Sequence, residues 1–442
     1  MKLSQKQIFI LAGIAVVFIL IFVVVGLNVR RDSGVREQVS LNFWGTESSA
    51  AIEKVIQSYK AFRPNVQVTY KEIDPAKYDG VLVDALAEGA GPDVLYVRNR
   101  ALPKHMNKLY PILPAQLGLA GFRNFFPAVA EQDFVSASGS PATGEAKQIF
   151  ALPLYVDTMA TIYNKDLFNQ AAIVFPPKTW DEFLSIVPRL KTLNESGQIV
   201  RAAAAIGGSE QSVDAGVDLL VLLMLQNGTQ MTTNNFSSAT FASARDDNKN
   251  PGLAAFNFYL QFANAGSPRY TWNDAQQNSI DSFANGKTAI VFNYKSAIDK
   301  IGGKSPFLNV AVAPMLQPTG SETGVNYPRY WGLAVSKQSK SIGWAWDFAL
   351  FATTNPDASK LYLDATGHPP ALRSLIAQKL DDPDMGVFVR QALTAQSWHE
   401  ADDEIIDRII NDAITRVLSG KADSEHALRQ AQDQASQLMT SK

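Results

Sequence analysis

Residues 39–70 read VSLNFWGTESSAAIEKVIQSYKAFRPNVQVTY, and this stretch predicts a strand, a helix and a second strand in succession. The first strand is expected at 39–44, where apolar and polar residues alternate as they do along a half-buried strand. A helix is expected next because apolar residues recur at three- and four-residue spacing: Ile52, Val55, Ile56 and Tyr59. The second strand is expected at 66–70. This order of elements indicates an α/β fold.

Both ends of this helix carry local signals. Thr46 or Ser48 is able to cap the first turn, because Ser and Thr side chains accept hydrogen bonds from the free N–H groups there. Pro64 ends the helix, because proline lacks the N–H group that a helix interior needs.

The alternation of strands and helices continues along the chain. A third helix-then-strand passage ends in GPDVLYV at 91–97, and further strands are expected at 288–292 and 330–335. An amphipathic helix is expected at 342–351, and from Pro356 onward the pattern is almost wholly helical. Strands that alternate with helices predict a mainly parallel sheet with both faces covered.

The composition fits a globular chain without thiol or metal chemistry. The 442 residues are 46% hydrophobic and 19% charged, which suffices for a buried core and for two or three domains. A formal net charge of -2 gives no long-range attraction to nucleic acid, so no nucleic-acid partner is expected. The lack of cysteine excludes disulfides, Cys-based zinc sites and a bacterial lipoprotein anchor. The four histidines share no metal-ligand spacing, and no cofactor or metal is expected.

Residues 8–27 read IFILAGIAVVFILIFVVVGL and carry no charge. Helical residues rise about 1.5 Å each, so this run spans about 30 Å, the thickness of a bilayer's hydrocarbon core. We therefore expect a transmembrane signal anchor at 8–27, a cytoplasmic N-terminus at 1–7 and a polar tether at 28–38. The alternatives are a cleaved signal peptide, whose apolar region is usually shorter (about 7–15 residues), and a buried core helix. The basic residues on either side of the run do not decide its orientation.

Four stretches, in order, resemble the family 1 extracellular solute-binding proteins, the group that includes maltose-binding protein. The first two are 39–70 and GPDVLYV at 91–97. The third and most specific is ALPLYVDTMATIYNKDLFNQAAIVFPPKTWDEF at 151–183, whose Leu-Pro, Tyr-Asn-Lys-Asp-Leu-Phe and Pro-Pro-Lys-Thr-Trp-Asp-Glu-Phe follow the family's order and spacing. The fourth pairs FANGKTAIVFN at 283–293 with WGLAVSKQSKSIGWAWDFALFAT at 331–353 and TGHPPALRS at 366–374. The resemblance extends to the C-terminus.

This resemblance implies a type II periplasmic-binding-protein-like α/β fold, with two discontinuous lobes and a ligand cleft between them. Lobe one would take 39–153 with 295–329. Lobe two would take 157–291 with 333–442. Strands would cross between the lobes near 154–156, 292–294 and 330–332.

The resemblance also implies a function. The chain would be a non-catalytic receptor that closes on a small polar ligand by hinge motion and delivers it to an ABC transporter permease. The same resemblance places the binding domain outside the cell membrane.

Ten residues are expected to bind the ligand, because they follow strands or begin a crossing strand, where the cleft of such a fold lies. They are Trp44, Glu47, Arg98, Asn99, Asp157, Trp272, Asn293, Tyr294, Tyr330 and Trp331. Trp272 would act as a lid aromatic from a polar loop. Each also has a structural alternative, such as a helix first turn for Glu47, a cap for Asp157 or core packing for Tyr294.

Aromatic rings beside carboxylates and amides favour a mono- or oligosaccharide, because a ring stacks on the apolar face of a sugar while polar groups bind its hydroxyls. Amino-acid and iron receptors stay open as alternatives within the family. Outside it, the alternatives are a membrane-anchored sensor or adhesion module not coupled to transport, and a sugar-processing enzyme with two carboxylates. We do not expect an enzyme.

Overall fold

The computed structural model describes residues 37–137 and 147–440. Every helix and strand named below lies in one compact unit, residues 39–442. The apolar run at 8–27 lies outside the described residues, as does nearly all of the tether at 28–38. Within the described ranges, no helix is long and apolar enough to cross a bilayer.

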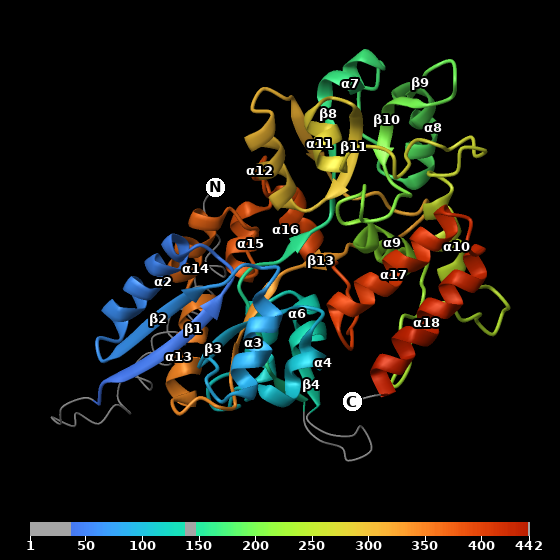
Figure 1. Cartoon of the computed structure of the whole chain (residues 1–442). Coiled ribbons are helices and arrows are strands. Elements are labelled where there is room, and N and C mark those ends of the chain that lie inside the picture. The colour runs from blue at the N-terminus through green and yellow to red at the C-terminus, as the bar shows by residue number, and fades with distance from the viewer. Residues whose placement is uncertain (1–36, 138–146, 441–442) are drawn as a thin grey trace, which may run out of the picture. The chain divides into compact units, whose positions relative to one another are not determined.

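The first sheet has five strands in the order β2-β1-β3-β14-β6, of which β1, β2 and β3 are labelled in Figure 1. Their bounds are β1 Val39–Gly45, β2 Val66–Glu72, β3 Val94–Arg98, β6 Ala151–Pro153 and β14 Trp331–Val335. β1 runs parallel to β2 and β3, and these are the three strands predicted at the N-terminal end. β14 runs antiparallel to β3 and β6, and the chain reaches it only after passing through a second sheet. The sheet is therefore mixed: β2, β1, β3 and β6 run in one direction, as expected for a mainly parallel sheet, and β14 runs in the opposite one.

The helix predicted after β1 is α2, Ser49–Phe62. Its buried side chains include all four residues of the predicted stripe. Ser48 occupies the N-cap position, but its side chain makes no capping hydrogen bond. Instead, the Ser49 N–H donates to the carboxylate of Glu72, at the end of β2, over 2.7 Å, and Ser49 Oγ donates to it over 2.9 Å. The cap comes from a neighbouring strand, which no local sequence pattern indicates.

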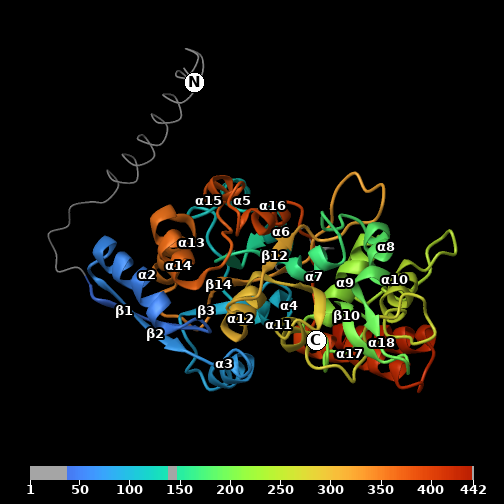
Figure 2. The ribbon, with the colours of Figure 1, turned by 90° about the horizontal axis from the view of Figure 1, so that it is seen from above.

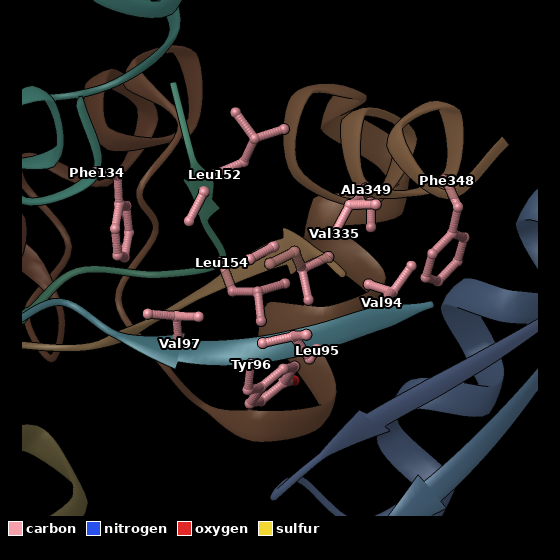
Figure 3. Close-up of a cluster of buried hydrophobic side chains, with 14 of the residues drawn as sticks. Val94, Leu95, Tyr96, Val97, Phe134, Leu152, Leu154, Val335, Phe348 and Ala349 are labelled. Atoms are coloured by element: carbon pink, nitrogen blue, oxygen red, sulfur yellow. The ribbon is translucent and has the colours of Figure 1, made fainter. Parts of the chain in front are cut away.

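The core beside the first sheet is centred on β3, where four successive side chains from Val94 to Val97 are buried. A continuous apolar run is typical of a strand covered on both faces. Figure 3 shows these side chains with Val335 of β14 and Phe348 of α13 in the same cluster. The other elements of this region are α3 Tyr78–Ala87, α4 Leu102–His105, the 3-10 turn Met106–Lys108, α5 Leu119–Phe125, α6 Ala128–Phe134, β4 Val135–Ala137, β5 Lys147–Ile149, α13 Ile342–Thr354, α14 Pro356–Thr366 and α15 Arg373–Lys379.

The second sheet has the order β12-β8-β11-β10-β9. Its strands are β8 Ala160–Asn164, β9 Thr192–Leu193, β10 Ile199–Ala205, β11 Thr288–Asn293 and β12 Val310–Ala313. β10 and β11 are parallel, whereas β8 runs antiparallel to β11 and β12. Its helices are α7 Lys165–Gln170, α8 Trp180–Leu190, α9 Gly216–Gln226, α10 Pro251–Leu260, α11 Ser279–Ala284, α12 Lys295–Lys304, α17 Asp403–Leu418 and α18 Ser424–Thr440. α17 and α18 pack on each other and contact α9 and α10 (Figure 2).

Two lobes follow from the way the sheets and their buried side chains are grouped. The N-lobe comprises residues 39–153 and 331–395, around the first sheet. The C-lobe comprises residues 159–327 and 398–440, around the second sheet. Each lobe is discontinuous in sequence.

Within the described residues, the chain passes between the lobes at 154–158, at 328–330 and at 396–397, and we call these three segments the hinge. The first two segments contain β7, Asp157–Thr158, and β13, Pro328–Arg329, which pair with each other as a short antiparallel ribbon. α16, Gly386–Ala392, packs against β7 and precedes the third segment.

The expected lobe boundaries are wrong for two segments. β12 pairs with β8, so the chain from 295 to 327 belongs with the second sheet instead of the first. β14 pairs with β3 and β6, so the chain from 333 to 395 belongs with the first sheet. Residues 292–294 do not cross either, because β11 leads directly into α12 within one core. A short apolar strand carries no local sign of which sheet it joins.

Candidate ligand-binding cleft

The carboxyl ends of β1 and β3 meet at one edge of the first sheet, because the two strands are parallel. Trp44 lies at the end of β1, and Arg98 lies at the end of β3. The antiparallel strand β14 begins at the same edge, and its first residue, Trp331, pairs with Arg98. This edge meets the C-lobe, since Arg98 forms an ion pair with Asp403 of α17. Three residues from three strands thus lie at the edge where the lobes touch.

The indoles of Trp44 and Trp331 are both half-buried. Tyr78 meets the ring of Trp331 edge-on, with 5.4 Å between ring centroids, and the Arg98 guanidinium lies 4.9 Å from the Trp331 centroid. The ammonium of Lys71 lies 4.0 Å from the ring centroid of Trp44. Each indole is held by packing on one side and keeps some surface exposed. That arrangement suits a ring that stacks on a ligand.

Glu47, in the loop after β1, is held by two residues that are distant in sequence. Its Oε1 accepts a hydrogen bond from the Tyr362 hydroxyl over 3.1 Å and lies 3.0 Å from Nε2 of His368. The side chains of Glu47 and His368 are 18% and 16% exposed, so both keep some surface accessible to solvent. The carboxylate is fixed in orientation before any ligand binds, which reduces the entropy lost on binding.

Two arginines at the end of β3 join the lobes. Nη1 of Arg98 lies 3.0 Å from Asp403 and 3.3 Å from Glu404. Arg100, two residues on, lies 2.9 Å from Glu400 and 3.0 Å from Asp407. Burial alone would lower the pKa of Arg100, but the carboxylates of Asp407 and Glu400 raise it well above its usual value. Arg100 is therefore a permanent cation between the lobes.

Asp218, in the first turn of α9, organises the C-lobe side of this boundary. It is 1% exposed, accepts a hydrogen bond from the Tyr294 hydroxyl over 2.5 Å and lies 2.6 Å from Nη2 of Arg329. Burial raises the pKa of Asp218, but the guanidinium groups of Arg329 and Arg100 outweigh it and hold the pKa below the usual value. Arg329 also lies 4.6 Å from the ring centroid of Tyr294. Tyr294 is thus bound to an ion pair whose carboxylate is buried.

Asn99 and Tyr330 are buried around a carboxylate that sequence reasoning missed. Asp133 of α6 accepts hydrogen bonds from Asn99 Nδ2 over 3.2 Å, from the Tyr330 hydroxyl over 2.5 Å and from Ser397 Oγ. Burial raises the pKa of Asp133 to about 7, although these donors lower it. Because Tyr330 and Ser397 stand in two hinge segments, Asp133 ties the hinge to the N-lobe.

Asp157 and Asn293 are each 3% exposed and serve local structure. Asp157, in the first hinge segment, accepts hydrogen bonds from the N–H groups of Thr158 over 2.8 Å and Lys295 over 3.0 Å. Burial raises the pKa of Asp157 to about 6. Asn293 Nδ2 donates to Asp214 over 2.9 Å. Both side chains are engaged by the protein itself.

The expectation of a lid aromatic at Trp272 is wrong. The ring is completely buried, and its Nε1 donates to Ser212 Oγ over 2.9 Å. The preceding residue, Thr271, accepts a hydrogen bond from the Ala203 N–H of β10 over 2.7 Å. The loop is drawn onto the sheet by these bonds, and its indole fills a core of the C-lobe.

A hollow of about 540 Å³ lies beside this boundary and is not lined by the predicted residues. It is bounded by Leu102 and Met106 on the N-lobe side, by Asn235 and Phe236 on the C-lobe side, and by His399 next to the hinge. Of the predicted residues Trp44, Glu47, Arg98 and Trp331, Arg98 forms ion pairs across the boundary, with Asp403 and Glu404.

Several residues at the boundary were not found from sequence: His368, Arg100, Glu400, Asp403 and Asp407. The run DDEIID at 402–407 is the one signal that could have drawn attention to α17. Acidic residues are common in a first helical turn, however, where they interact favourably with the helix dipole. Only the tertiary fold brings this turn to the end of β3.

A profile of the family described as Bacterial extracellular solute-binding protein matches residues 44–358, a range that includes every strand of both sheets except most of β1. This chain belongs to that family. A relative, the Multiple sugar-binding protein of Streptococcus mutans, is 22% identical over 397 residues, which cover 86% of this chain and 87% of the relative. The resemblance seen in the sequence is confirmed.

Solved structures share the fold. The sugar-binding protein MalE from the phytopathogen Xanthomonas citri matches with a TM-score of 0.74 at 19% identity, over 91% of this chain and 98% of that one. An ABC substrate-binding protein from Listeria monocytogenes, in complex with cycloalternan, matches with a TM-score of 0.72 at 18% identity, over 91% of this chain and 99% of that one. At these identities the likeness establishes the fold alone, which is the two-lobed α/β fold of type II periplasmic binding proteins.

Proposed function

We propose that this chain is an extracytoplasmic receptor that captures a carbohydrate between its lobes for an ABC importer. The observation that carries the proposal is the pair of half-buried indoles, Trp44 and Trp331, which lie with Glu47 and Arg98 at one edge of the N-lobe sheet. A partly exposed indole beside a guanidinium, with a fixed carboxylate in the loop after β1, suits the alternating apolar and hydroxyl surfaces of a sugar.

The relatives support the same ligand class. The Streptococcus mutans relative is named for multiple sugars, and the Listeria monocytogenes structure contains cycloalternan. Both match more than four-fifths of this chain. These relatives and the family are binding proteins, so we assign no catalytic residues.

We further propose that the ligand is enclosed by hinge closure. The hinge segments are short, and two of them pair as the β7–β13 ribbon, so each lobe would move as a body about this region. Arg98 at the end of β3 would then close over a ligand that rests on Trp331.

A binding screen tests the ligand class. The full chain in detergent would be heated with linear and cyclic oligosaccharides, monosaccharides, amino acids and polyamines, and hits would be titrated calorimetrically. A ligand at about 100 times its dissociation constant stabilises the fold by about 2.7 kcal/mol. Stabilisation by a saccharide supports the proposal. Stabilisation only by amino acids or polyamines, or by no solute, would contradict it.

We also propose that residues 8–27 anchor the receptor in the cell membrane with the binding domain outside, because the run is uncharged and long enough to span a bilayer. An anchored chain stays with membranes after an alkaline carbonate wash, whereas a chain that begins at residue 37 is released. Protease added to intact cells lacking an outer barrier should digest the binding domain. Release of the full chain by carbonate would contradict anchoring.

An uptake experiment can distinguish a receptor that serves transport from one that serves sensing. An anchored sensor or adhesion module is the alternative, because an anchor serves either role equally well. Cells that lack this chain should lose uptake of the sugar found in the screen, and the full chain should restore it. Unchanged uptake, with a lost transcriptional response to the same sugar, would favour the sensor.

A further inference from the structure

Three basic side chains of the N-lobe extend across the boundary between the lobes. Arg98 and Arg100 follow β3, and Lys104 lies in α4. Arg98 lies 3.0 Å from Asp403, and Lys104 Nζ lies 3.1 Å from Asp402. Both carboxylates stand at the start of α17, which is part of the C-lobe. The contact between lobes is therefore ionic along this edge.

Arg100 is the centre of this contact. Its Nη1 and Nη2 each donate over 3.0 Å to one oxygen of Asp407, and Nη1 also lies 2.9 Å from Glu400 and 3.7 Å from Asp218. These partners come from α17, from the residues just after the hinge and from α9. The side chain of Arg100 is 6% exposed, and those of Glu400 and Asp218 are 0% and 2% exposed. One N-lobe guanidinium thus binds three separate parts of the C-lobe.

The energetics of this cluster depend on whether the lobes touch. A buried carboxylate that loses its cation is strongly destabilised, because neither water nor a counter-charge compensates for its desolvation. When the lobes separate, the same carboxylates and Arg100 become hydrated and need no partner. Removal of Arg100 therefore destabilises the state in which the lobes touch far more than the separated state.

We propose that Arg100 and its partners Glu400, Asp407 and Asp218, assisted by Arg98 and Asp403, form an ionic latch that holds the two lobes together before a ligand binds. The proposal rests on the hinge motion proposed above but not on the ligand's being a sugar. The latch makes contact between the lobes an intrinsic property of the chain, which a ligand then reinforces.

Some carboxylate oxygens of the latch have no hydrogen-bond partner in the part of the chain that the structure describes. Among the described residues, Oε2 of Glu400 and Oδ1 of Asp403 are buried and have no hydrogen-bond partner. Burial and the neighbouring carboxylates Asp407 and Asp403, despite Arg100, raise the pKa of Glu400 well above its usual value. The free energy needed to bury these carboxylates offsets part of the attraction to Arg100. The latch is consequently able to open, as a receptor that must admit a ligand requires.

The latch also touches the proposed ligand site. The Arg98 guanidinium pairs with Asp403 on one side and lies 4.9 Å from the ring centroid of Trp331 on the other. A ligand that stacks on Trp331 would contact the same guanidinium. Ligand binding and closure of the latch are therefore coupled through one side chain.

Distance measurements between the lobes test this proposal directly. The chain has no cysteine, so Lys54→Cys in α2 and Lys300→Cys in α12, both exposed, would carry two spin labels without background labelling. Without ligand, the full chain should show mainly one short distance. Arg100→Met should raise the ratio of long to short distances at least tenfold. Arg123→Met is the matched control, because Arg123 also binds a carboxylate, Glu131, through two nitrogens, but within the N-lobe.

A second variant keeps the test decisive if Arg100→Met folds poorly. Arg100→Met combined with Glu400→Gln and Asp407→Asn leaves fewer buried charges unpaired, so it should recover much of the short-distance population. Identical ligand-free distances in wild type and Arg100→Met would overturn the latch, as would a wild type that closes only when a sugar is added. That last result would leave hinge closure intact. If no sugar alters the distances, hinge closure on ligand would be refuted. The latch would then be tested only by comparing the ligand-free distances of wild type and Arg100→Met.

Discussion

Tyr155 and His368 stack face to face, with ring centroids 3.9 Å apart and ring planes 5° from parallel. Tyr155 lies in the first hinge segment, and His368 lies in the loop after α14. Nε2 of the same imidazole lies 3.0 Å from Oε1 of Glu47. The hinge is thus linked through one imidazole to the loop after β1, where ligand contact is proposed.

Substitution of His368 should measure the strength of this link. His368→Ala removes both the stack and the contact with Glu47, so we expect the free energy of unfolding to fall by about 1–3 kcal/mol. His368→Phe keeps a ring on Tyr155 and should lose less. Urea unfolding of the three proteins checks the order. Equal stability of wild type and His368→Ala would show that the link contributes nothing.

Trp331 should matter for affinity more than for stability. Trp331→Ala removes a half-buried ring from the cleft edge, and we expect the affinity for a bound saccharide to fall by about 10–100-fold. Trp344, a half-buried indole in α13, provides the control, because it packs against the N-lobe core. Calorimetric titration of both variants checks the difference. An equal loss of affinity in the two would contradict a role for Trp331 in stacking.

Local patterns predicted much of the fold. β1, α2 and β2 follow from residue spacing within about thirty residues, because periodicity is a local property of the chain. The sheet that β12 or β14 joins is not a local property. Both strands pair across more than a hundred residues of intervening chain, and their own sequences are short apolar runs.

The site was only partly predictable for a similar reason. A position just after a strand places Trp44, Glu47 and Arg98 at the sheet edge, and these side chains keep some exposed surface. The same rule selected Asn99 and Asn293, whose side chains turn inward to bind Asp133 and Asp214. Whether a side chain turns toward the cleft depends on the partners around it. Those partners lie up to several hundred residues away.

Asp133 leads us to expect stability to fall as the pH rises. Burial raises its pKa in the folded protein from 3.8 to about 7, so between these values the folded state holds a proton that the unfolded state has released. The free energy of unfolding should therefore decrease with rising pH across this window, by at most about 1.4 kcal/mol per pH unit from this group, and level off above it.

Asp133→Asn should flatten this part of the pH profile, because Asn does not titrate. Urea unfolding at about pH 5 and about pH 8 would measure the slope in both proteins. Asp381→Asn is the control, since the Asp381 side chain is 98% exposed and its substitution should leave the slope as it is. Asp157, whose pKa burial raises to about 6, should keep some slope in every variant. An Asp133→Asn protein with the full wild-type slope would refute the assignment.

Substitutions of Glu72 and Ser48 should show whether the N-terminus of α2 is capped by a residue of a neighbouring strand or by the residue at its own N-cap position. Ser48 stands at the N-cap of α2 without a capping hydrogen bond, whereas Glu72 accepts hydrogen bonds from both the N–H and the hydroxyl of Ser49 over 2.7 and 2.9 Å. Glu72→Ala should therefore lower the free energy of unfolding by about 1 kcal/mol, as loss of a cap does, and Ser48→Ala should leave it nearly unchanged. Urea unfolding of both variants, with Glu72→Gln as a variant that keeps an acceptor, would check this. A loss in Ser48→Ala as large as in Glu72→Ala would mean that the serine caps the helix in solution. The sequence pattern at 46–49 would then have been the better guide to this helix end.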